Sequence, residues 1–159
     1  MGYLVDTNIL TRLIVLKDPL SQLARAAIDK LQQDGAGLLV APQNLIEFWA
    51  VATRPVEANG LGLSVERAAE EVTRFEGVFR LADEPPELFR RWRQLVEHHA
   101  VKGKQVHDAR LVAMMIESDV DHILTFNVGD FRRYPDITAV SPHGFSPPHS
   151  APEQGGATV

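Results

Sequence analysis

Short apolar runs alternate with longer amphipathic stretches along almost the whole of this chain, and this alternation limits the folds it can adopt. Strands are predicted at residues 3–6, 37–41, 78–81, 122–125 and 137–140, and helices at residues 8–16, 20–33, 42–53, 65–75, 86–99 and 106–118. Parallel strands need a long crossover, usually a helix, between one strand and the next. The pattern therefore predicts an α/β fold with a mostly parallel sheet and helices on both of its faces.

The bulk properties suit one domain. A chain of 159 residues can build its own hydrophobic core. Residues 142–159 are rich in proline and glycine, so we expect a folded domain over residues 1–141 and a disordered or peripheral tail over 142–159.

The absence of cysteine excludes disulfides and thiolate metal sites. No apolar run approaches the roughly 18 residues that span a bilayer, and we see no secretory signal. We therefore expect a cytoplasmic protein with no membrane contact.

Asp6 is the first candidate functional residue. It ends the apolar run of residues 3–5 and is followed at once by Thr7, Asn8 and a new apolar stretch. Open α/β sheets bind their ligands at the carboxyl ends of the strands, where such an acid would lie. A single aspartate proves little, so the question is whether other acids join it.

Two further acids lie on predicted helices. Glu47 has apolar neighbours on both sides, and a buried carboxylate is costly unless it is paired or bound to a cation. It could instead lie in a narrow polar stripe or pair with Arg54. Asp108 falls near the start of its helix, where the helix macrodipole alone would favour an acid. Neither residue is decisive by itself.

The segment of residues 125–131 follows a predicted strand and carries two oxygen donors, Asn127 and Asp130. An ordinary turn would also use asparagine, glycine and aspartate. The joint pattern is more specific, because a parallel fold brings these positions to one edge of the sheet. Hard oxygen ligands suit Mg²⁺ or Mn²⁺, which polarise phosphoryl oxygens and activate water. Nothing in the sequence fixes whether one or two ions bind.

The same residues resemble a known family. The segments of residues 4–10, 107–109 and 124–127, with Glu47 between them and Asp130 after them, are similar to those of PIN-domain ribonucleases. Within that group the chain is most similar to the VapC-type toxins of bacterial type II toxin–antitoxin pairs. The resemblance implies a three-layer α/β/α sandwich and a Mg²⁺- or Mn²⁺-dependent endoribonuclease that hydrolyses RNA phosphodiester bonds with metal-activated water.

The resemblance also implies roles for individual residues. Asp6, Glu47 and Asp108 would be the central catalytic, metal-binding carboxylates. The family often has an acid where this chain has Asn127, so Asp130 would supply the fourth carboxylate, or Asn127 would bind the metal without adding charge. Thr7 and Thr125 would support the ligands through hydrogen bonds from their hydroxyls.

Substrate and partners are predicted more loosely. Lys102, Lys104 and Arg110 lie close to Asp108 in sequence and would contact RNA phosphates, although a solvated basic surface explains each equally well. The net charge of −5 argues against non-specific coating of nucleic acid but does not exclude a nuclease. The resemblance implies a cognate antitoxin and a homodimer. The apolar segments of residues 10–16 and 48–51 would offer partner surfaces or belong to the core.

Proteins of other functional classes share part of this sequence pattern. A phosphatase of the haloacid-dehalogenase type also opens with a strand-terminal aspartate, but it needs a second aspartate two residues later, where this chain has Asn8. A receiver domain needs an acidic pair near its start, which is not evident. A catalytically silent PIN-like module that binds RNA or protein stays open, because Asn127 lacks the charge of an acid.

Overall fold

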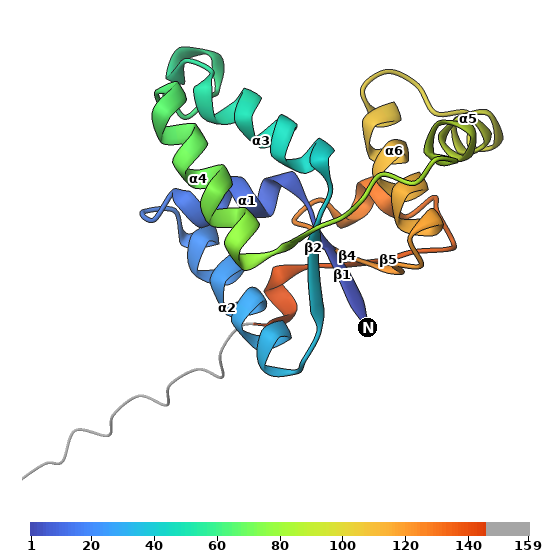
Figure 1. Cartoon of the computed structure of the whole chain (residues 1–159), viewed down its shortest axis with the longest axis horizontal. Helices are drawn as coiled ribbons and strands as arrows, with labels where there is room; N and C mark the ends of the chain where they lie inside the picture. The colour runs from blue at the N-terminus through green and yellow to red at the C-terminus, as the bar shows by residue number, and fades with distance from the viewer. Residues whose placement is uncertain (146–159) are drawn as a thin grey trace, which may run out of the picture.

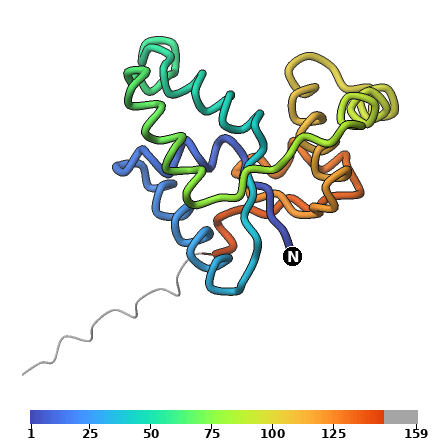
Figure 2. Tube along the Cα trace, in the orientation of Figure 1, coloured from blue at the N-terminus to red at the C-terminus, as the bar shows by residue number. Residues whose placement is uncertain are grey.

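The computed structural model describes residues 1–145 and contains one five-stranded sheet (Figure 1). The strands are β1 (Gly2–Val5), β2 (Gly37–Val40), β3 (Arg80–Leu81), β4 (His122–Leu124) and β5 (Thr138–Val140). Their order is β3-β2-β1-β4-β5, and all four neighbouring pairs run parallel. The N-terminal strand thus lies in the middle of the sheet, as the chain trace also shows (Figure 2). The predicted parallel sheet is confirmed.

Six α-helices cover the two faces of the sheet. They are α1 (Thr7–Ile14), α2 (Pro19–Gln33), α3 (Pro42–Thr53), α4 (Val65–Val78), α5 (Leu88–His98) and α6 (Gln105–Glu117). The first four lie on one side and α5 and α6 on the other (Figure 1). Among residues 1–145, no helix combines the length and apolarity needed to cross a membrane.

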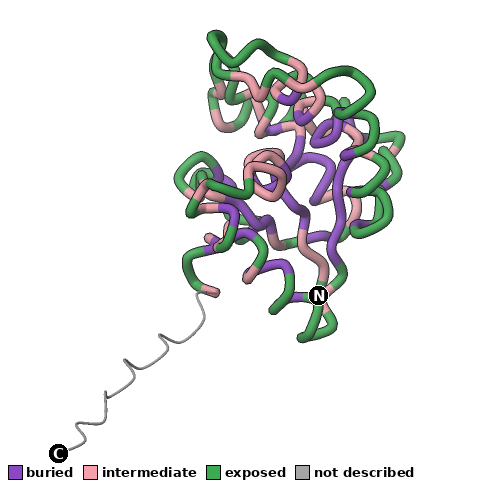
Figure 3. The backbone as a smooth tube through the Cα atoms, turned by 90° about the vertical axis from the view of Figure 1, so that its left-hand side faces the viewer, coloured by how far each residue is buried: buried purple, intermediate pink, exposed green. Residues whose placement is uncertain are grey.

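The core is divided by the sheet because successive side chains of a strand point to opposite faces. Leu4 and Leu39 pack with α5 and α6, whereas Val5 and Val40 pack with the other four helices. Buried backbone accordingly runs through the middle of the molecule and exposed segments surround it (Figure 3). This arrangement is the expected three-layer α/β/α sandwich.

The predicted helix ends follow local capping chemistry. Asp18 accepts a hydrogen bond from Leu20 N at 2.9 Å at the start of α2, and Ser64 accepts one from Arg67 N at 3.1 Å at the start of α4. The prediction of a strand from residue 78 was wrong at its first residues, because α4 continues to Val78. Phe75 packs inward and keeps the helix on the core for that last turn.

The folded region extends beyond the predicted boundary at residue 141. Three short 3₁₀ helices join the α-helices, namely η1 (Val56–Ala58), η2 (Val128–Phe131) and η3 (Pro142–Phe145). Pro142 is buried and Phe145 packs against the core beside α2. The rest of the predicted tail, residues 146–159, lies outside the described residues.

The strand order determines where a site can form. The chain moves from β1 to β2 on one side, and β4 later takes the place on the other side of β1. The carboxyl ends of β1 and β4 therefore lie together at a switch point, where α/β sheets open to bind ligands. Asp6 follows β1 at this point and Thr125 follows β4, and Asp6 N donates to Leu124 O at 3.0 Å.

Candidate active site

Asp6 is held in one orientation by the ends of both strands. One carboxylate oxygen, Oδ1, accepts from Thr7 N at 2.8 Å, so Asp6 also caps α1. The other, Oδ2, accepts from Thr125 Oγ1 at 2.8 Å and from Asn8 Nδ2 at 3.3 Å. The residue is 7% exposed. The carboxylate therefore has few remaining directions in which to meet a ligand.

Glu47 reaches the same place from α3. Its Oε2 accepts from Thr7 Oγ1 at 2.7 Å and its Oε1 accepts from Gln43 Nε2 at 2.8 Å. The helix around Glu47 is not buried on every side, because its neighbour Ile46 is 69% exposed. Glu47 and Gln43, four residues apart, form a polar stripe, and among the described residues Arg54 makes no ion pair with Glu47. This polar stripe faces the acidic side chains at the carboxyl edge of the sheet.

Asp108 approaches from the other helical layer, in the first turn of α6. Its carboxylate accepts no hydrogen bond from any residue in the part of the chain that the structure describes. It opens with Asp6 and Glu47 into a cavity of about 280 Å³, which we call the acidic hollow. The hollow is lined by Asp6, Thr7, Asn8, Thr11, Arg12, Glu47, Val51, Asp108 and Asn127.

The acids in this hollow resist ionisation. The pKa of Asp6 is raised from 3.8 to about 6, mainly by burial; the hydrogen bonds from Thr125 and Thr7 lower it, and the charges of Glu47 and Asp130 raise it. Burial also raises the pKa of Asp108 to about 7, helped by repulsion from Asp6, Asp130 and Glu47. Mutual repulsion of this kind is relieved when a cation enters the site.

Asn127 and Asp130, the two candidates for the last ligand, take different places. Asn127 lines the acidic hollow, and its backbone N–H donates to Thr125 Oγ1 at 3.0 Å. Asp130 is exposed in η2, yet its charge acts on both Asp6 and Asp108. The fold thus brings both residues to the site and leaves the choice between them to experiment.

Several supporting residues carried no recognisable signal in the sequence. Asn8 bridges the two strand ends, since its Nδ2 donates to Thr125 Oγ1 at 3.1 Å and its Oδ1 accepts from Phe126 N at 3.1 Å. Gln43 links the layers by donating from Nε2 to His107 O at 2.8 Å. Asn44 donates to Thr7 Oγ1 at 3.3 Å. Arg12 lines the hollow and pairs with Asp18.

The basic residues that were predicted to contact RNA do not line the acidic hollow. Arg110 donates to Gln43 Oε1 at 3.0 Å and to Glu84 Oε1 at 2.8 Å. Lys102 and Lys104 are exposed in the loop before α6. The positive charge of Arg133 acts to lower the pKa of Asp108.

A divalent cation fits the donor set of the acidic hollow. Its polar walls offer carboxylate, amide and hydroxyl oxygens, which are ligands of Mg²⁺ and Mn²⁺. Within residues 1–145, no group of three or more acidic or histidine side chains is close enough to enclose an ion by itself. Mg²⁺ commonly binds through one or two carboxylates and keeps several waters, so a closed protein cage is not required.

Solved structures of toxin–antitoxin proteins have this fold. The chain is similar to DNA-bound VapBC from Salmonella typhimurium, with 17% identity and a TM-score of 0.67 over 89% of this chain and 98% of that one. It is similar to VapBC2 from Rickettsia felis bound to promoter DNA, with 16% identity and a TM-score of 0.66 over 89% and 98%. It is also similar to VapC20 from Mycobacterium tuberculosis, a sarcin-ricin loop cleaving toxin, with 18% identity and a TM-score of 0.53 over 76% and 86%.

The family is established by sequence. The family model of the PIN domain matches residues 3–137, which run from the second residue of β1 to just before β5. The chain therefore belongs to the PIN domain family. A comparison with curated protein sequences gave no match.

Proposed function

We propose that this protein is a Mg²⁺- or Mn²⁺-dependent endoribonuclease and the toxin of a toxin–antitoxin pair. The observation that carries the proposal is the convergence of Asp6, Glu47 and Asp108 from three elements on one hollow, with the pKa of two of them raised. Membership of the PIN domain family and the likeness to VapC structures support the nuclease class.

Each residue has a role in this proposal. Asp6, Glu47 and Asp108 would hold the cation, and Asp130 or Asn127 would complete its surroundings. When bound, the cation would activate water and stabilise the charge that develops on the phosphoryl group. The hydroxyl of Thr125 fixes one oxygen of Asp6, and that of Thr7 fixes one oxygen of Glu47.

Cleavage of single-stranded RNA by the purified protein, freed of any partner, tests the activity. We expect cleavage with Mn²⁺ or Mg²⁺ and none with EDTA. Asp6→Asn and Asp108→Asn should each reduce cleavage on the order of 100-fold or more, because each removes a metal-binding charge. Asp136→Asn is the matched control, since Asp136 is exposed and lies outside the acidic hollow.

Two results would contradict the proposal. Cleavage that survives EDTA or either site substitution would place the chemistry elsewhere. Absence of both cleavage and divalent-metal binding, measured by calorimetry on the same preparation, would favour the silent PIN-like module instead. The position of Asn127 in the acidic hollow is the observation behind that second candidate.

The toxin role implies a partner chain, and the surface offers an apolar face for one. Residues 10 and 48 of the predicted partner segments are buried in the core, the alternative that the sequence left open for them. The outward side of α3 instead carries Ile46, Trp49 and Ala50, which with Leu45 and Val72 line an open apolar cavity of about 430 Å³. An exposed apolar patch of this kind is typical of protein–protein contacts.

Partner binding is tested by measuring mass in solution and by co-expression. A homodimer would double the mass found by light scattering, and Ile46→Glu would return it to that of the monomer. An antitoxin encoded beside the gene should co-purify and inhibit cleavage. The proposal includes a cytoplasmic location, where RNA and such an antitoxin meet.

A further inference from the structure

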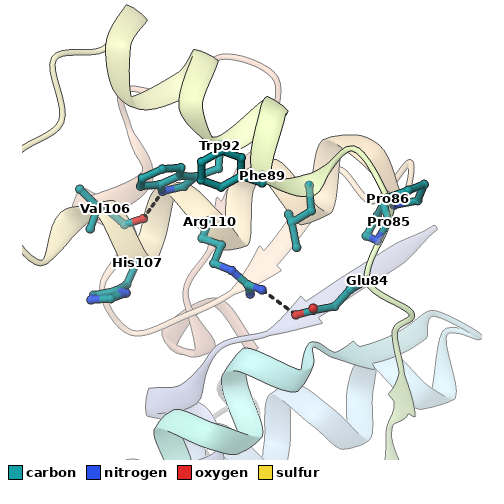
Figure 4. A pocket seen from close by; sticks show the side chains of 9 residues that line it. Glu84, Pro85, Pro86, Phe89, Trp92, Val106, His107 and Arg110 are labelled. Atoms are coloured by element: carbon teal, nitrogen blue, oxygen red, sulfur yellow. Dashed lines mark hydrogen bonds and ion pairs between the residues drawn. The ribbon is translucent and has the colours of Figure 1, made fainter.

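A second hollow lies between α5 and α6, beside the acidic one, and the activity described above does not use it. It has a volume of about 480 Å³ and is lined by residues that include Glu84, Phe89, Trp92, Val106, His107 and Arg110. Phe89 and Trp92 lie next to each other on α5, with Arg110 facing them from α6 (Figure 4). We call this cavity the aromatic hollow.

The rings of Phe89 and Trp92 lie side by side along the cavity. Trp92 Nε1 donates to Val106 O at 2.8 Å, which fixes the indole against the start of α6. The ring centroids of Phe89 and Trp92 are 5.5 Å apart with a tilt of 33° between their planes. Phe89 is nevertheless 70% exposed. A large apolar ring held at the surface beside a cavity offers its face to a flat ligand.

The side chain of Gln43 connects a residue of the aromatic hollow with a residue of the acidic hollow. Its Oε1 accepts from Arg110, which lines the aromatic hollow, at 3.0 Å. Its Nε2 donates to Glu47, which lines the acidic hollow, at 2.8 Å. A ligand that occupies both cavities would therefore pass directly over Gln43.

Positively charged residues lie in the aromatic hollow and in the loop before α6. Lys104 lies two residues before Val106, Lys102 lies in the same loop, and both are exposed. Arg110 lies inside the cavity, where Glu84 balances its charge. Aromatic faces beside cations are the combination that proteins use for single-stranded nucleic acids, whose bases stack while their phosphates meet lysine and arginine.

We propose that the aromatic hollow binds one unpaired base of a single-stranded RNA, stacked on Phe89, while the adjoining backbone enters the acidic hollow. The inference rests on the proposed function, since it describes a second contact of the same substrate. A base fits better than an apolar peptide here, because the cavity adjoins the acids through Gln43 and carries cations at its edge.

The fluorescence of Trp92 reports directly on this contact. The chain has two tryptophans, so Trp49→Phe leaves Trp92 alone. We would titrate this variant in EDTA, at fixed salt, with RNA homopolymers of about eight nucleotides, a length within the range bound by single-strand binding folds. A base stacked beside Trp92 should quench its emission. An RNA of the same length with abasic sites keeps the phosphates and should quench far less.

Substitutions of the exposed ring test the stacking without disturbing the core. Phe89→Ala and Phe89→Leu should each weaken RNA binding roughly fivefold to tenfold, because stacking on an aromatic side chain contributes about that much per base. Phe89→Trp should restore the affinity, since it returns an aromatic face. Leu16→Ala is the matched control, because Leu16 is 68% exposed and lies outside both hollows.

The outcomes separate this inference from the proposed function. Normal cleavage by Phe89→Ala at an unchanged KM, with no quenching of Trp92, overturns the base site and leaves the nuclease intact. Quenching by intact RNA without any cleavage in Mn²⁺ supports the base site and contradicts the nuclease. If Phe89→Leu binds RNA as well as the unchanged protein does but loses a partner protein, the hollow is a protein-docking site and the inference is wrong.

Discussion

Replacing Asp108 by asparagine should stabilise the metal-free protein at neutral pH while removing activity. The substitution keeps the shape of the side chain and removes one charge from a site where charges repel. Burial and the neighbouring acids raise the pKa of Asp108 from 3.8 to about 7. Because its carboxylate accepts no hydrogen bond from the residues that the structure describes, the amide breaks no contact.

The sign and size follow from proton linkage. Below pH 3.8 the carboxyl is protonated in both the folded and unfolded chains and has no effect. Between pH 3.8 and about 7 the unfolded chain loses its proton first, so the folded state loses stability as pH rises, and the loss is complete above about pH 7. A fully buried carboxyl would lose about 4 kcal/mol. Solvent screening at this half-buried group reduces the loss to about 1–2 kcal/mol.

One opposing effect lowers the net gain. Asp108 lies in the first turn of α6, where its charge interacts favourably with the helix macrodipole by about 0.5 kcal/mol. Asp108→Asn should therefore gain about 1 kcal/mol at pH 8, which for a chain of this size is a rise in melting temperature of about 2–4 °C. At pH 4 the two proteins should melt together.

Thermal melts followed by circular dichroism in EDTA, at half-unit steps from pH 4 to pH 8, measure this difference. Asp136→Asn removes an exposed charge that lies outside the acidic hollow, so it controls for the change in net charge. Equal melting temperatures of the unchanged protein and Asp108→Asn at pH 8, or a difference that does not shrink toward pH 4, would show that repulsion in the acidic hollow is not the cause.

Three further predictions concern metal binding and the stability of the fold. Mn²⁺ should raise the melting temperature more at pH 8 than at pH 5, because cation and protons compete for the carboxylates; an equal rise at both values would contradict metal binding there. Thr125→Val should cost about 2–3 kcal/mol in urea unfolding, because Asp6 loses a buried donor, and Thr125→Ser should restore most of it. Gly60→Ala should destabilise the protein, because a Cβ would lie 2.0 Å from the Arg54 carbonyl oxygen, whereas Gly77→Ala, with open space in α4, should stabilise it by up to about 1 kcal/mol.

Much of the fold could be predicted because its determinants are local. Strand and helix positions follow from the period of apolar residues, and helix starts follow from capping residues such as Asp18 and Ser64. The strand-end position of Asp6 and the first-turn position of Asp108 were visible for the same reason. Even the error at Val78 concerns the end of an element, where packing against distant residues decides the outcome.

The support of the site could not be predicted in this way. Gln43 contacts the backbone of residue 107, 64 residues later, and Asn8 contacts Thr125, 117 residues later. Asparagine and glutamine on a helix are compatible with solvent, caps or buried networks, and only the fold decides among these. The aromatic hollow is equally non-local, since Trp92 and Arg110 come from different helices.

The three central acids come from three different places in the layered structure. This explains why they repel one another and why the fold nevertheless holds them close together. Asp6 lies at the end of a central strand, Glu47 comes from one helical layer and Asp108 from the other. They meet at the seam between the two helical layers, at the carboxyl edge of the sheet. Gln43 crosses this seam and ties α3 to the backbone of α6, so Glu47 cannot retreat from the other acids without breaking that link. A cation bound in the acidic hollow, as we propose, would relieve the repulsion among these charges.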